Sequence, residues 1–141
     1  MSIWAHINGT VRYDVLSIGS PMVEPEFNTY KWDDSGKSID ECNVPYGSEG
    51  SITVNKYDVY RRKNQAFVTY AFSGDLRDYS FEENSKKMEE WIQSLVPDEK
   101  AGHWIRQAIF QIEYGDHDEM IIYIYDDELK KFKRGENSEQ S

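Results

Sequence analysis

The sequence predicts an α+β domain in which a five-stranded, mostly antiparallel sheet carries one main amphipathic helix packed on one face. The first predicted strand alternates apolar and polar residues, further strand-like segments are paired through short turns, and one long segment has helical spacing. Short turns make the hairpins antiparallel, and a lone amphipathic helix needs a sheet face to cover. The predicted order is strand, long excursion, hairpin, helix, hairpin.

The length of the chain favours a single domain. Its 141 residues suffice for one hydrophobic core, and aromatic residues, at 14%, can bury a large area. We place one α+β domain over residues 1–128. Residues 129–141 end in a polar tract, so we expect them to form a disordered tail.

Residues 3–15 are the clearest predicted strand. Odd positions hold an apolar series, whereas even positions hold mostly polar side chains, so one face of the strand should be buried. The odd series is Ile3, Ala5, Ile7, Gly9, Val11, Tyr13 and Val15, and the even series is Trp4, His6, Asn8, Thr10, Arg12 and Asp14.

A long excursion, residues 17–49, breaks this pattern with repeated prolines and glycines. Loops of this length are uncommon inside a compact domain unless they are functional or mobile. The excursion also holds Phe27, Tyr30 and Trp32, which a purely flexible linker would not need. It is therefore a candidate for a short hidden helix or strand, and for function.

Residues 51–61 and 66–72 are the next two predicted strands, and the short turn between them makes an antiparallel hairpin. Ile52 and Val54 begin one phase of alternation, and Tyr57 continues in the other phase. We expect a bulge near Asn55 to account for this change.

Residues 80–95 are the predicted helix. Ser80 can cap its N-terminus, and Glu83, three residues later, completes a capping box. Apolar side chains recur on one side at helical spacing, and Pro97 opposes continuation of the helix. The apolar set is Phe81, Met88, Trp91, Ile92 and Leu95.

Residues 104–114 and 120–125 are the last two predicted strands. The polar turn between them makes a second hairpin. With the first strand and the first hairpin, they complete the five strands of the predicted sheet.

Composition excludes several classes of function. The net charge of −10, from 26 acidic and 16 basic residues, opposes direct binding to nucleic acid. No stretch approaches the roughly 20 apolar residues of a membrane span, and the N-terminus lacks the features of a signal peptide. The single cysteine, Cys42, fits a reducing compartment. We expect a cytoplasmic protein that contacts no membrane.

The glycine-rich segment 43–51, NVPYGSEGS, raises the possibility of a phosphate cradle. Phosphate loops follow a strand, open a helix and end in Gly-Lys-Ser/Thr, whereas this segment precedes a strand and has no lysine. Glu49 would repel phosphate. We predict a tight turn in which Gly47 and Gly50 adopt positive φ, and no cofactor.

The turn 116–119 gathers Asp116, His117, Asp118 and Glu119, which are residue types that bind metals. Turns also favour aspartate for backbone hydrogen bonding, and nothing in the sequence brings distant ligands to this turn. We predict no catalytic, cofactor-binding or metal-ligating residue. A small metal-dependent hydrolase centred on this turn is retained as an alternative.

Acidic and aromatic residues are interleaved along the chain, and exposed aromatics commonly anchor protein interfaces. Acidic flanks favour a basic partner and speed the encounter with it. The excursion concentrates both residue types. The predicted partner-binding residues are Trp32, Asp33, Asp34, Tyr46 and Glu49.

The segments SIWAHINGTVRYDV, YGSEGSI and GDLRDYSFEENSKKMEEWI resemble, in this order, a type of small uncharacterised protein encoded by bacteriophages of Gram-positive bacteria. The resemblance implies a phage or prophage origin and assigns no activity. Our hypothesis is a non-catalytic, acidic binding protein that docks on a basic surface of a bacterial host protein and inhibits a nucleic-acid-handling or defence enzyme. An immunity protein against a basic toxin is the closest alternative.

Overall fold

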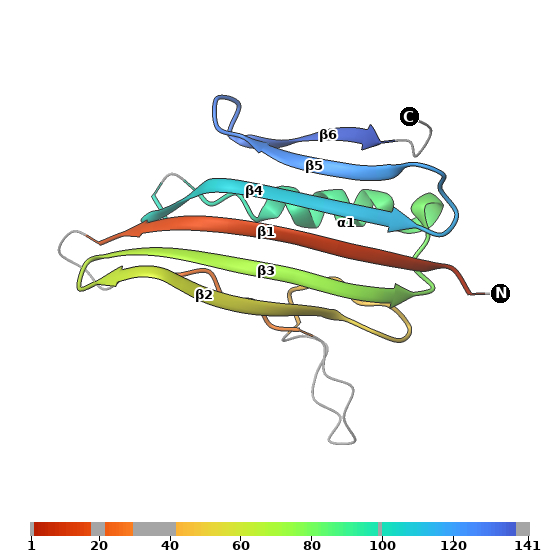
Figure 1. Cartoon of the computed structure of the whole chain (residues 1–141), viewed down its shortest axis with the longest axis horizontal. Coiled ribbons are helices and arrows are strands. Elements are labelled where there is room, and N and C mark those ends of the chain that lie inside the picture. The colour runs from red at the N-terminus through yellow and green to blue at the C-terminus, as the bar shows by residue number, and fades with distance from the viewer. Residues whose placement is uncertain (1, 18–21, 30–41, 99, 138–141) are drawn as a thin grey trace, which may run out of the picture.

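The computed structural model describes residues 2–17, 22–29, 42–98 and 100–137, which form one six-stranded antiparallel sheet and a helix (Figure 1). The strand order is β2-β3-β1-β4-β5-β6. The α+β class is confirmed, but the sheet has six strands instead of five. The elements are β1 (Trp4–Leu16), β2 (Ile52–Arg62), β3 (Gln65–Arg77), α1 (Phe81–Ser94), β4 (His103–Tyr114), β5 (Met120–Asp126) and β6 (Lys131–Asn137).

Strand β1 lies inside the sheet and pairs antiparallel with β3 on one side and β4 on the other. Its predicted alternation is confirmed, since the odd-numbered residues from Ala5 to Val15 are buried except for the half-buried Gly9, whereas the even-numbered residues are exposed or half-buried. The buried face is the core face of the sheet, and we call the opposite face the open face.

Helix α1 packs on the core face, behind β1 and β4 in Figure 1. The predicted helix is confirmed, because the Ser80 side chain accepts a hydrogen bond from the Glu83 amide and Met88 and Ile92 are fully buried. Beneath the helix, the ring of Phe110 lies so close to Gly9 that a Cβ there would clash at 2.3 Å. Among the described residues, no helix is long and apolar enough to cross a membrane.

The irregularity in β2 lies between Asp58 and Tyr60 instead of near Asn55. Residues 52–57 pair with β3 without a shift in register, so Tyr57 points to the open face and is 56% exposed. The predicted position was wrong because we treated this aromatic side chain as core. A bulge in an edge strand twists it away from pairing with other chains.

Residues 131–137 form β6, so the expectation of a disordered tail from residue 129 is wrong for them. β6 pairs with β5 along its whole length, and its Phe132 is buried against the core. Gln93 of the helix accepts a hydrogen bond from the Phe132 amide and donates one to its carbonyl. The remainder of β6 is rich in lysine. Such charge suits a strand at the edge of a sheet, because it discourages pairing with a strand of another chain.

The described parts of the excursion lie on the core face, where they extend the second layer beside α1. Residues 22–28, which we call the strap, run beside the inner side of β2 and β3. The hidden helix or strand that we considered is absent from segments 22–29 and 42–50, where Tyr46 forms only an isolated bridge to Ser51.

Replacing Ile92 with alanine should lower the free energy of unfolding by about 2–5 kcal/mol, because the side chain is fully buried between helix and sheet. Urea denaturation followed by circular dichroism measures the change. Glu90→Ala on the exposed side of the same helix is the matched control and should stay within about 0.5 kcal/mol of wild type. Equal stabilities for the two variants would contradict this packing of α1.

Candidate functional site

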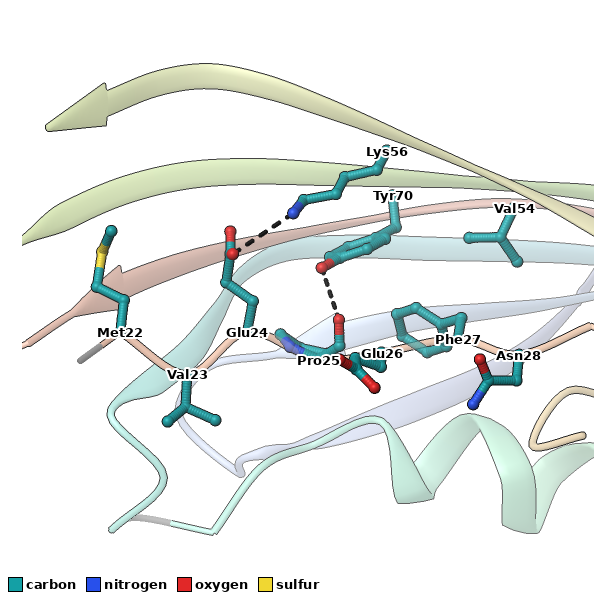
Figure 2. A pocket seen from close by; sticks show the side chains of 10 residues that line it. All are labelled: Met22, Val23, Glu24, Pro25, Glu26, Phe27, Asn28, Val54, Lys56 and Tyr70. Atoms are coloured by element: carbon teal, nitrogen blue, oxygen red, sulfur yellow. Dashed lines mark hydrogen bonds and ion pairs between the residues drawn. The ribbon is translucent and has the colours of Figure 1, made fainter. Parts of the chain in front are cut away.

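A groove with a volume of about 660 Å³ lies between the strap and the inner side of the sheet (Figure 2). Phe27 from the strap, Val54 from β2 and Tyr70 from β3 form its apolar part. The carboxylates of Glu24 and Glu26 contribute its acidic part. The groove therefore combines aromatic surface with negative charge.

The strap is fixed to β3 through aromatic packing and a hydrogen bond from Tyr70. Tyr70 donates its phenolic hydrogen to the Pro25 carbonyl at 2.7 Å, as Figure 2 shows. The ring of Phe27 stands edge-on to Tyr70, with ring centroids 4.9 Å apart, and to Phe72 at 5.1 Å. Such edge-to-face pairs add directional attraction to the area that they bury.

Asn43 holds the other side of the strap. Its side-chain amide donates to the Glu26 carbonyl at 2.8 Å and accepts from the Asn28 amide at 2.6 Å. Trp91 of the helix in turn donates to the Asn43 carbonyl at 2.9 Å. The strap and the helix are thus connected through one asparagine, which gives the groove a defined wall.

The two carboxylates of the groove differ in their partners. Glu24 is 21% exposed and forms ion pairs with Lys56 and Arg61 of β2. Arg61 also contacts Asp58, and this hydrogen bond lowers the pKa of the Asp58 carboxyl. Glu26 is exposed and has no cationic partner among the residues that the structure describes. Its charge is therefore available to a ligand.

The same environment shifts the pKa of Tyr70. Burial, followed by the negative charges of Glu24 and Asp58, raises the pKa of its phenol to about 12. The neutral hydroxyl therefore persists as a hydrogen-bond donor to Pro25 throughout the physiological pH range.

The chemistry of the groove suits binding. The described lining residues include no serine, cysteine or histidine, so these residues do not form the usual pairing of such a nucleophile with a histidine base. A lysine or arginine side chain can lay its aliphatic stem on Val54 and Phe27 and direct its charge to Glu26. The Tyr70 ring can also attract a cation.

The glycine-rich segment 43–51 forms a turn at the end of β3. Gly50 has a φ of +79°, which confirms the prediction for this residue. Gly47 does not have positive φ, and that prediction was wrong. Position 47 has no room for a side chain, because a Cβ there would lie 2.3 Å from the Arg77 carbonyl oxygen. The segment leads into β2 and opens no helix, so it lacks the setting of a phosphate loop.

The acidic turn 116–119 serves the helix N-terminus. Asp116 accepts hydrogen bonds from the amides of Phe81 at 2.8 Å and Glu82 at 3.5 Å. The His117 ring stacks on Phe81, with centroids 3.9 Å apart. Within the described part of the chain, no group of three or more histidine, cysteine or acidic residues is placed to hold a metal ion. These contacts give the turn a structural role.

The predicted partner-binding residues fall into two groups. Trp32, Asp33 and Asp34 lie outside the described residues. Tyr46 is 36% exposed beside the turn, and Glu49 forms an ion pair with Arg77 at 2.6 Å. Tyr46 and Glu49 are therefore brought to one loop, at the end of β3, and neither lines the groove.

Sequence reasoning did not predict the groove. Its strap reads MVEPEFN, and the residue before a proline favours extended backbone, so Glu24-Pro25 signals an extended segment. The contacts that turn this segment into a wall come from Asn43, Tyr70 and Trp91, far away in the sequence. No local pattern contains them.

Comparison with protein-family models, with curated proteins and with solved structures finds no match for this chain. The geometry and chemistry of the groove therefore carry the functional inference.

The raised pKa of Tyr70 predicts a loss of stability in alkali. Its contribution is complete below the unfolded pKa of about 10 and is lost as the pH rises through about 12. Urea denaturation at about pH 8 and about pH 11 measures this loss. Tyr70→Phe should show a smaller loss than wild type, whereas the exposed control Tyr57→Phe should behave like wild type. Equal losses in all three proteins would contradict the assignment.

Proposed function

We propose that this chain is a non-catalytic binding protein that docks an acidic groove on a basic surface of a bacterial host protein. The observation that carries the proposal is the combination of an aromatic floor with a carboxylate, Glu26, that has no cationic partner among the described residues. A basic side chain of the partner would enter between the strap and β2. Its stem would bury apolar area, and its charge would meet Glu26.

The overall negative charge of the chain supports recognition of a basic partner. A net charge of −10 attracts basic surfaces over distances comparable to the Debye length, about 10 Å at 0.1 M salt. Long-range attraction raises the association rate, and buried contacts then set the lifetime of the complex. Binding should therefore be fast at low salt and slower at high salt.

The resemblance to small phage proteins favours a partner in the cytoplasm of a bacterial host. Host enzymes that handle nucleic acid bind it through basic surfaces. An acidic protein that covers such a surface competes with the nucleic acid and inhibits the enzyme. We propose this inhibition, including that of a defence enzyme, as the activity of the chain.

Reversing the charge of the groove should weaken partner capture. Immobilised wild-type protein, Glu26→Lys and Glu90→Lys are exposed to the same bacterial lysate, and retained proteins are identified by mass spectrometry. Glu90 is an equally charged, exposed residue on the helix, so its variant matches the change in net charge. The proposal predicts a basic protein retained by wild type and by Glu90→Lys and lost with Glu26→Lys. Retention by all three, or no basic protein at all, would contradict it.

The excursion residues make a kinetic prediction for the purified pair. Charge reversal of Asp33 and Asp34 should mainly lower the association rate, by about tenfold at low salt, because these charges act before contact. Trp32→Ala should mainly raise the dissociation rate, since an aromatic anchor acts after contact. Surface plasmon resonance separates the two rates. An association rate independent of salt, or unchanged binding without Trp32 and Tyr46, would contradict this account.

A further inference from the structure

The open face of the sheet is large enough for a stable protein contact. Its longest strands have 13 residues, which corresponds to about 43 Å, and six strands span about 24 Å. After allowance for the shorter β5 and β6, the face covers roughly 900 Å². A stable interface buries about 800 Å² on each partner, so this face alone suffices.

The middle of the open face combines exposed isoleucines with small and polar residues, and it is uneven. Ile109 of β4 and Ile124 of β5 are neighbours, and they are 37% and 53% exposed. On one side of them lies a hollow of about 340 Å³ over Thr10 and Ala71. On the other side a hollow of about 390 Å³ lies beside Gly135, which has no side chain to fill it. This ridge between hollows can interlock with another surface.

One end of the open face is aromatic and cationic. The Arg12 guanidinium, which forms an ion pair with Asp14 on the same face at 3.3 Å, lies 4.8 Å from the centre of the Phe67 ring. Tyr60 stacks on the same ring at 5.0 Å. Arg62 lies over Tyr60 at 5.4 Å, and the neighbouring Trp104 is 46% exposed. Tryptophan, tyrosine and arginine are the residues most enriched at the energetic centres of interfaces.

The β-bulge of β4 adds another cation to this end. The register between β1 and β4 shifts between Arg12 and Tyr13, and Arg106 is the β4 residue without a β1 partner. Arg106 is exposed, as is the adjacent Gln107. It has no anionic partner in the described part of the chain, so its charge is available across an interface.

The other end of the open face is anionic. His6 of β1 stands between Asp75 of β3 and Glu113 of β4, its partners in the two neighbouring strands. The His6 imidazole and the Asp75 carboxylate form a hydrogen bond. Glu113 is exposed and lacks a cationic partner within the described residues. The two ends lie on opposite sides of the Thr10–Ile109–Ile124 row.

We propose that two copies of this chain pack open face against open face. A two-fold axis across the strands at the Thr10–Ile109–Ile124 row lays the cationic end of each copy on the anionic end of the other. It also brings the exposed isoleucines of both copies together, as isologous symmetry requires. Opposite charges then meet although each chain carries −10, because both signs are present on this face.

The dimer leaves the groove free. The groove lies on the core side of the sheet, between the strap and β2, whereas the contact uses the opposite side. Each copy thus presents its own acidic groove, and the assembly is bivalent. The dimer does not depend on the proposed function, and each can be tested without the other.

Sedimentation velocity of the full chain over a dilution series tests the contact. Wild type should pass from monomer to dimer as its concentration rises. Ile124→Arg should raise the dissociation constant of the dimer by about tenfold or more, because it places a charge at the centre of the face. Val23→Arg is the matched control. Val23 is 62% exposed on the strap, so its variant should dimerise like wild type.

A charge exchange on β4 tests the direction of the axis. Glu113→Arg and Arg106→Glu should each weaken the dimer, by about fivefold or more, since each brings like charges together. The double variant should recover wild-type affinity. A monomer at every concentration, or equal effects of Ile124→Arg and Val23→Arg, would overturn the dimer. A monomer that binds a single-stranded oligonucleotide through Trp104 would likewise overturn it. If the single variants weaken the dimer and the double variant does not recover wild-type affinity, the proposed position of the two-fold axis is wrong.

Discussion

The structure depends on one constraint, which is the alternation of β1 together with its position between β3 and β4. An inner strand with one apolar and one polar face divides the whole sheet into a core side and an open side. A single helix of 14 residues cannot cover six strands, and α1 lies behind β1 and β4. The strap fills the core side beside β2 and β3, and its incomplete coverage there leaves the groove.

Local patterns were sufficient to predict the elements that carry strong signals. The alternation of residues 3–15 predicted β1 and its buried face, and the capping box at Ser80 predicted the start of α1. Patterns were less informative at the sheet edges, where few side chains face the core. They predicted the strand at residues 51–61 but misplaced its irregularity, and they missed β6. In β6 only Phe132 is buried among the side chains described, and β2 exposes Tyr57, so neither edge shows the alternation of a half-buried strand.

The sites depend on contacts between segments distant in the sequence, so they were less predictable. The excursion was recognised as a candidate for function, but the groove requires Asn43 to bridge the strap and Trp91. The polar face of β1 was predicted as well. The charge difference between the two ends of the open face could not be predicted, because it depends on the strand order. That order places Asp75 and Glu113 on either side of His6. Neither feature has a signature within a short stretch of sequence.

Hydroxyl-radical footprinting over a protein dilution series tests most directly whether the open face is an interaction surface. The account predicts that Trp104 is labelled in the dilute protein and protected in the concentrated protein, because two open faces then cover each other. Val23 on the strap should be labelled equally at both concentrations, since it lies on the other side of the sheet. Equal labelling of Trp104 throughout the series would contradict the account.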